Sequence, residues 1–394
     1  MVRTYDITLP GDTSWLADAD AQAVCQAIEA GGHRIYFVGG CVRNALLGLP
    51  DSDVDMSTDA LPERVMALAR GAGLKAVPTG VEHGTVTVVS GGKGFEVTTF
   101  RRDVETDGRH AVVVFSDNIG DDARRRDFTM NALYADAEGR VIDPLEGMAD
   151  LRARRVRFIE DADARIREDY LRTLRFFRFC AWYSDPAEGF DADALSAIAS
   201  NTEGLEALSA ERVGAEMQKI LRAPDPAPAL AAMRQTGVLG AVLPGSDDRW
   251  IAMLVHFETL AGVPVTWLWR LAALGGEGLA DRLRLSKADA RELDRLKDAA
   301  FEGKSLAELA YRHGAKIAQG AWLLRACIAE TPPDLHGLET IHNASEAVFP
   351  IKSADLMPEY SGSDLGKRLK QLEAAWIASG FAADRATLLD TPDI

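Results

Sequence analysis

Two aspartates that lie two residues apart, Asp53 and Asp55, are the strongest candidates for chemistry in this 394-residue sequence. Alternate residues of a β-strand point to one face, so a strand at Ser52–Met56 lets both carboxylates converge on one or two divalent ions. Oxygen ligands favour Mg²⁺ or Mn²⁺. Glu96, in the apolar run Phe95–Phe100, is a third catalytic candidate that either completes the metal site from an adjacent strand or lies on a hairpin face. A solvated strand that merely carries two aspartates is the alternative.

A pair of glycines ends the apolar run Arg34–Val38 and precedes an arginine four residues further on. At such a strand-to-helix turn, Gly39 and Gly40 let backbone N–H groups approach an anion, and Arg43 adds a positive charge on the first helical turn. We expect a phosphate group at this corner. A plain turn without a ligand is the alternative.

Three successive arginines, Arg124 to Arg126, repel one another on a plain surface but suit a site that neutralises a triphosphate. Asp127 and Asn131 follow at a spacing of four, which predicts that they share a helix face. They would offer a carboxylate and an amide to a ribose hydroxyl. A solvated, basic start of a helix is the alternative.

A charged stripe with a spacing of three residues follows, in which Asp169, Arg172, Arg175 and Arg178 are predicted to share one face of a helix. Cytosine and adenine both place an amine donor beside a ring-nitrogen acceptor. A carboxylate and a guanidinium, such as those of Asp169 and Arg172, match that pattern and leave buried groups unpaired against uracil and guanine. A ladder of ion pairs that supports a packed helix is the alternative.

The pattern of apolar residues predicts an α+β fold in which a mixed-sheet N-terminal region precedes an all-helical remainder. Helices are expected at Leu16–Ala30 and Leu61–Gly71, and a hairpin at Thr85–Ser90 and Phe95–Phe100. After Asp143 the β pattern almost vanishes. We expect three parts, at residues 1–150, 151–225 and 226–394.

Charge and composition exclude several classes of protein. Acidic residues outnumber basic ones 60 to 44, which argues against a non-specific nucleic-acid coat, although residues 152–178 hold nine arginines and five acids. The four cysteines lack metal-binding spacing and fit a reducing cytosol. No apolar segment is long enough to span a membrane, so we expect a soluble cytoplasmic protein with no membrane partner.

Five motifs occur in an order that resembles the class II tRNA nucleotidyltransferases, the CCA-adding enzymes, which share their core with bacterial poly(A) polymerases. The motifs are GGCVRNALLG with DSDVDM, RRDFTMNALYAD, DPLEGMADL, EDYLRTLRFFRF and ERVGAEMQKIL. The resemblance implies a nucleotidyltransferase (polymerase-β-like) head, a base-reading helical neck, and a helical body and tail that hold tRNA. It also implies CTP and ATP as substrates, release of pyrophosphate, and no obligate protein partner.

Carried over residue by residue, the resemblance makes Asp53 and Asp55 the metal-binding pair and assigns nucleotide contacts to Gly40, Arg43, Arg126 and the charged stripe. Residues 101–114 are similar to the family's flexible loop, which is linked to the switch from adding C to adding A. Asn44 replaces the usual aspartate, and His110 interrupts the usual loop pattern. Residues 78–84 lack the basic stretch of poly(A) polymerases, which favours CCA addition over the alternatives of poly(A) synthesis, CC-only addition and A-only addition.

Overall fold

The structure is a computed structural model that describes residues 3–107 and 110–392, without the side chains of residues 3–6, 103–107 and 110–112. The chain forms two compact units. The first comprises Met1–Ala223 and Pro228–Val242, and the second comprises Pro224–Ala227 and Leu243–Ile394. The division predicted near residue 150 therefore falls inside the first unit.

Eight strands form one mixed sheet in the order β1-β10-β9-β2-β3-β6-β5-β4. The strands are β1 (Arg3–Thr8), β2 (Ile35–Val38), β3 (Asp55–Thr58), β4 (Lys75–Gly80), β5 (Thr85–Ser90), β6 (Lys93–Thr99), β9 (Tyr134–Ala135) and β10 (Arg140–Asp143). Neighbours β3 and β6 run parallel, and the other neighbouring pairs run antiparallel. The predicted hairpin is present as β5 and β6.

The strand predicted at Ser52–Met56 begins later, at Asp55, so Asp53 lies in the loop before it and not on the strand. The reason is the length of its partner. Strand β2 pairs with β3 from Ile35 opposite Thr58 to Val38 opposite Asp55, and β2 then ends at the glycine turn. Residues before Asp55 therefore have no β2 residue with which to pair.

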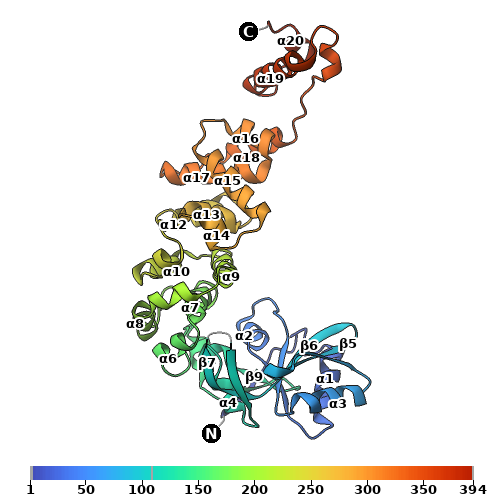
Figure 1. The fold of residues 1–394 in the computed structure, drawn as a ribbon, viewed down its shortest axis with the longest axis vertical. Coiled ribbons are helices and arrows are strands. Elements are labelled where there is room, and N and C mark those ends of the chain that lie inside the picture. The colour runs from blue at the N-terminus through green and yellow to red at the C-terminus, as the bar shows by residue number, and fades with distance from the viewer. Residues whose placement is uncertain (1–2, 108–109, 393–394) are drawn as a thin grey trace. The chain divides into compact units, whose positions relative to one another are not determined.

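Helices α1 (Ala19–Glu29) and α3 (Pro62–Gly71) pack against each other and against β5 (Figure 1). The buried side chains of α1 recur at spacings of three and four residues, as in Val24 and Ile28, which is the pattern that predicts an amphipathic helix. On β5 the buried residues Val86 and Val88 alternate with less buried ones. These two periodicities build the core behind the sheet.

The segment similar to a flexible loop, residues 101–114, adopts two antiparallel strands, β7 (Arg101–Asp107) and β8 (His110–Phe115). They form a separate two-stranded sheet. The side chain of His110 lies outside the described residues, so its effect on the loop pattern stays a prediction.

Beyond β10 the described residues form helices, with isolated bridges at Phe158 and at Ser246 with Gly275 as the remaining β pairing. In the first unit the helices after the first sheet strands are α2 (Gly40–Leu47), α4 (Ile119–Arg124), α5 (Gly147–Arg152), α6 (Ala162–Glu168), α7 (Leu171–Tyr183), α8 (Ala192–Ser200), α9 (Ala210–Leu221), α10 (Ala227–Gln235) and α11 (Val238–Val242). The predicted change from mixed α/β to helical structure is confirmed, and the overall class is α+β.

The second unit is helical. Its helices are α12 (Ile251–Ala261), α13 (Trp267–Leu274), α14 (Leu279–Arg282), α15 (Lys287–Phe301), α16 (Leu306–His313), α17 (Ala315–Ile328), α18 (His336–Ser345), α19 (Gly362–Ala378) and α20 (Arg385–Leu389). Glu258 of α12 and Arg270 of α13 form a fully buried ion pair, with Arg270 Nη2 2.7 Å from Glu258 Oε2. Among the described helices, none is both long and apolar enough to cross a membrane.

Candidate active site

The three candidate catalytic carboxylates lie at one end of the parallel pair β3 and β6. Asp55 is the first residue of β3 and stands in register with Glu96 on β6, while Asp53 precedes β3 by two residues. All three residues are exposed. Even so, the pKa of the Asp55 carboxyl is raised, first by the protein atoms packed around it and then by the charge of Glu96. Arg126 opposes this rise and Asp53 adds to it.

This donor set fits a divalent cation. The carboxylates are hard oxygen ligands, and the mutual repulsion that raises the pKa of Asp55 is what a bound cation relieves. Among the described side chains, however, no three His, Cys, Asp or Glu groups converge on one point. Glu96 therefore lies beside Asp55 without completing a three-ligand group, and its role as a ligand stays a prediction.

The glycine turn joins β2 to α2, and each of its two positions requires glycine for a different reason. Gly39 has φ 76°, in the left-handed region that favours glycine. Gly40 lies close to Ser52, because a Cβ at Gly40 would approach Ser52 Oγ to 2.9 Å. The loop that carries Asp53 is thus packed directly over the start of α2. The predicted phosphate corner and the carboxylates are neighbours.

Arg43 lies on α2 but is buried, with 5% of its surface exposed, and does not project freely from the first turn. Its guanidinium donates to Asn131 Oδ1 at 2.7 Å, to Asn44 Oδ1 at 2.9 Å and to the Tyr183 hydroxyl at 2.8 Å. It also stacks on the Tyr183 ring, 4.0 Å from the centroid. These acceptors are uncharged, so the charge of Arg43 is left for an anion, and burial lowers its pKa.

Of the three successive arginines, Arg126 is the one whose charge acts on the carboxyl of Asp55. Its Nε donates to the Tyr134 hydroxyl at 3.2 Å, and its Nη2 lies 3.0 Å from Asp122 Oδ2. Arg125 also pairs with Asp122, at 2.7 Å. Arg124 instead faces the surface acids Asp121 and Glu160, at 3.5 Å from each. Two of the three arginines therefore belong to the site, and the fully buried Asp122 is a member that the sequence patterns did not single out.

The prediction that Asp127 and Asn131 share a helix face is wrong, because α4 ends at Arg124 and a 3-10 turn, Thr129–Asn131, follows. The two side chains nevertheless meet, as Asn131 Nδ2 donates to Asp127 Oδ1 at 3.1 Å. Asp127 is buried and also accepts from Arg175 Nε at 2.8 Å. Although burial opposes it, the charge of Arg175 holds the pKa of the Asp127 carboxyl well below its usual range.

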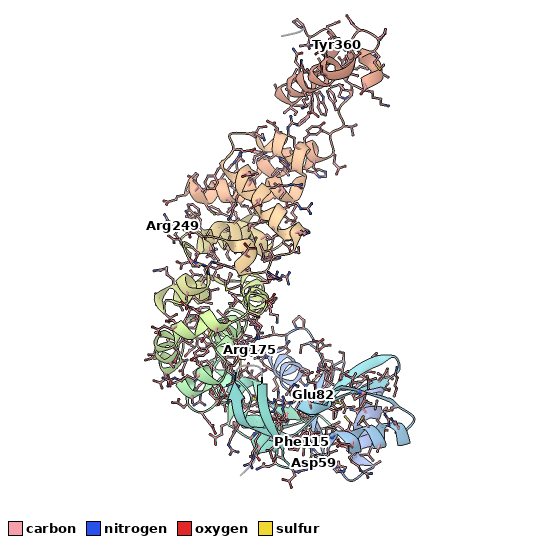
Figure 2. The ribbon with its side chains drawn as sticks, in the orientation of Figure 1. Asp59, Glu82, Phe115, Arg175, Arg249 and Tyr360 are labelled. Carbon is pink, nitrogen blue, oxygen red and sulfur yellow. The ribbon has the colours of Figure 1, made fainter. Side chains whose placement is uncertain are left out.

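A cavity of about 300 Å³ lies where these groups meet helix α7. Its lining residues are Arg125, Arg126, Asp127, Asn131, Asp169, Leu171, Arg172, Arg175 and Arg212. A larger cavity of about 720 Å³, lined mainly by residues 157–163 and by α8, contains none of the predicted site residues. The smaller cavity is therefore the candidate nucleobase pocket, and Arg175 on its wall is labelled in Figure 2.

The predicted stripe on one helix is only partly present. Helix α7 begins at Leu171, so Asp169 precedes the helix, and its Oδ1 accepts from the Leu171 N–H at 3.1 Å. Its Oδ2 accepts from Arg212 Nη2 on α9 at 2.6 Å. Arg172 is paired with Glu168 and still lines the cavity.

Arg178 does not line the cavity. Its Nε donates to Glu216 on α9 at 2.6 Å, and its guanidinium lies over the Phe179 ring. Phe128 packs at centroid distances of 4.7 Å from Phe179 and 5.1 Å from Phe158. This aromatic cluster fixes α7 against the segment that carries Asp127. The two segments that line the cavity are thus packed against each other.

Comparisons with known proteins agree with this geometry. A sequence model described as "Poly A polymerase head domain" matches residues 35–157, and one described as "Probable RNA and SrmB- binding site of polymerase A" matches residues 190–249. The chain is 31% identical over 376 residues to CCA tRNA nucleotidyltransferase 1, mitochondrial, of Mus musculus, covering 91% of this chain and 86% of that protein. The chain belongs to the CCA-adding tRNA nucleotidyltransferase family.

Two further relatives of this nucleotidyltransferase are bacterial. The CCA-adding enzyme of Geobacillus thermodenitrificans is 38% identical over 280 residues, which covers 70% of this chain and 67% of that one. The solved structure of the Bacillus stearothermophilus CCA-adding enzyme in complex with CTP matches with a TM-score of 0.72 and 30% identity, covering 91% of this chain and 92% of that one. The family and the enzyme class that the motifs predict are confirmed.

Proposed function

We propose that this nucleotidyltransferase adds C, C and A in turn to the 3′ end of tRNA, with CTP and ATP as donors. In each step the terminal 3′ oxygen forms a bond to the α-phosphorus, the bond to the β-phosphate bridge breaks, and pyrophosphate leaves with the hydroxyl proton going to solvent. No template strand is required, since the pocket itself selects the base.

One observation carries the proposal. Carboxylates suited to a divalent cation, a glycine turn and a buried arginine with uncharged partners lie in the same unit as a cavity lined by carboxylate and guanidinium groups. The first three features suit a triphosphate, and the cavity suits a base. A small-molecule nucleotidyltransferase would share the first three features, but the matched RNA-binding region at residues 190–249 supports an RNA acceptor.

The cation that we assign to Asp53 and Asp55 is Mg²⁺, with Mn²⁺ as a substitute, because the donor atoms are oxygens. Such an ion stabilises negative charge on the α-phosphate and acidifies the attacking hydroxyl. Around it, the turn brings the start of α2, with the backbone N–H of Gly40, toward the triphosphate, while the Gly39 N–H donates to the Leu133 carbonyl at 3.1 Å and holds the turn in place. Arg126 supplies a fixed positive charge near Asp55.

Base selection rests on Asp169 and Arg172. Asp169 is oriented by Arg212 and by the first N–H of α7, and this leaves further lone pairs on its two oxygens to accept the exocyclic amine of cytosine or adenine. Arg172 donates to the adjacent ring nitrogen. Uracil and guanine would leave both groups unpaired, and unpaired buried polar groups reduce binding strongly.

The test uses the purified protein and tRNA transcripts that end before the CCA, after C and after CC. CTP and ATP are supplied singly and together, and the 3′ ends are sequenced. The proposal expects CC from CTP alone and CCA from both. Long A tails would indicate a poly(A) polymerase, arrest after CC or extension of only the CC transcript would indicate a partial adder, and no extension would refute the proposed function.

We also propose that the enzyme acts in the cytoplasm. All four cysteines are free and buried, as is typical of proteins in a reducing compartment. The mouse relative is mitochondrial by name. Fractionation of cells that express the tagged chain distinguishes the two compartments.

A further inference from the structure

Asp122 is a fully buried carboxylate at the centre of a hydrogen-bond network beside the active site. It accepts from Arg125 Nε at 2.7 Å, from Arg126 Nη2 at 3.0 Å and from the Tyr134 hydroxyl at 2.8 Å. Ser57 Oγ lies 3.4 Å away, on the strand that begins with Asp55. The carboxylate of Asp122 therefore links α4, β3 and β9.

The network fixes the direction of the Arg126 guanidinium. Its Nε is bonded to Tyr134, and its Nη2 is bonded to Asp122 and lies 3.3 Å from Ser57 Oγ. The second terminal nitrogen, Nη1, points to the glycine turn, because a Cβ on Gly39 would lie 3.4 Å from it. Arg126 thus directs its Nη1 N–H groups toward the place where a triphosphate is proposed to bind.

The backbone beneath Arg126 is held by a different contact. Arg165 Nη2 donates to the carbonyl oxygens of Arg125 and Arg126, at 2.6 Å each. Loss of the Asp122 charge therefore releases the Arg126 side chain while the main chain keeps its support. This separation makes a specific effect on catalysis distinguishable from a general loss of structure.

We infer that Asp122 is a positioning residue, which holds Arg126 with its free N–H edge toward the triphosphate of CTP or ATP. The inference rests on the proposed function, because it needs a nucleotide at the glycine turn. Asp122 does not touch the nucleotide itself. Its charge acts through Arg126 by fixing one guanidinium orientation among the several that an unpaired arginine samples.

The test is steady-state kinetics of Asp122→Asn with CTP and with ATP. Without Asp122, the Arg126 guanidinium is no longer held toward the triphosphate, and the nucleotide loses one charge-assisted hydrogen bond. Such a loss weakens nucleotide binding by about tenfold or more, so KM for both nucleotides should rise by that factor while KM for tRNA stays unchanged. The same substitution made in an Arg126→Ala background should add nothing further, since the group on which Asp122 acts is then missing. An unchanged nucleotide KM, or an equal increase in the Arg126→Ala background, would overturn the inference.

Asp150→Asn is the matched control. Asp150 is also fully buried in the first unit and accepts from two arginines, Arg155 at 2.6 Å and Arg157 at 2.8 Å, but it does not line the nucleobase cavity. The Asp150→Asn variant should have a lower melting temperature and an unchanged nucleotide KM. If Asp150→Asn raises KM as much as Asp122→Asn does, the effect is structural and the inference fails.

A second variant covers the case in which Asp122→Asn is unstable, and the wild-type activity separates failure of this inference from failure of the proposed function. If Asp122→Asn does not fold, Tyr134→Phe removes one donor to Asp122 and one acceptor of Arg126, and it should raise nucleotide KM by the same route. An unchanged KM in that folded variant overturns the inference. Wild-type protein that extends no tRNA refutes the proposed function, whereas an active wild type with a silent Asp122→Asn refutes the positioning role alone.

Discussion

Asp169→Asn tests how this chain selects its bases. The substitution keeps the size of the side chain. It also keeps an oxygen that can accept from the Leu171 N–H, which lies 3.1 Å from Asp169 Oδ1 in the wild-type protein. It removes the negative charge that pairs with Arg212 at 2.6 Å. It also replaces one acceptor by an NH₂ donor, which opposes the amine of cytosine and matches the carbonyl of uracil.

The size of the effect follows from the contacts at this residue. Asp169 and Arg212 side chains are each 19% exposed, so the pair is partly shielded and the hydrogen bond to a base amine is charge-assisted. A hydrogen bond to a charged group contributes roughly 1.5–3 kcal/mol, or about 10- to 150-fold in kcat/KM. We expect CTP and ATP incorporation to fall by that factor and discrimination against UTP to fall at least as far.

The assay is single-nucleotide incorporation on a tRNA that ends before the CCA, with each of the four nucleotides supplied alone. Asp161→Asn is the control, because Asp161 caps α6 through the Ala164 N–H at 2.8 Å and does not line the nucleobase cavity. It should leave the ratio of C to U incorporation unchanged. If Asp169→Asn lowers all four nucleotides equally and keeps strict selection of C and A, Asp169 only caps α7 and the base-reading hypothesis is refuted.

Three further predictions concern catalysis and stability. Asp55→Ala should abolish incorporation while tRNA binding, measured by filter retention, stays within about twofold, because the change removes one of the two carboxylates to which we assign the divalent cation. The pKa of Asp127 is depressed by Arg175, so its contribution to stability is present above the unfolded pKa and is lost as pH falls through the folded one. Urea midpoints should therefore fall more steeply with pH below about 4 in the wild type than in Asp127→Asn, and equal slopes would contradict the assignment. Glu258→Ala removes the carboxylate that pairs with the buried Arg270 and should destabilise the second unit by about 3–5 kcal/mol in urea unfolding, whereas loss of the exposed Lys304–Glu302 pair should leave the midpoint nearly unchanged.

The sequence by itself determined the local features. The periodic apolar residues of α1 and the alternation in β5 are properties of a few adjacent residues, and each was predicted close to its observed bounds. The glycine turn and the spacing of Asp53 and Asp55 are likewise local. The motifs and their order, read together, gave the family that the relatives confirm. Strand ends were less certain, because the start of β3 depends on where its partner β2 stops.

Only the tertiary structure decided which charged groups face each other. Asp127 pairs with Arg175, 48 residues away, Asp169 with Arg212, 43 residues away, and Arg43 reaches Tyr183 across 140 residues. No periodicity reports such partners, since they depend on how α7 packs against α9, α2 and the segment that carries Asp127. In the described structure, seven of the nine arginines between residues 152 and 178 are engaged in ion pairs. The local excess of basic residues in the sequence therefore overstates the charge available to a polyanion, because folding pairs most of these arginines with carboxylates.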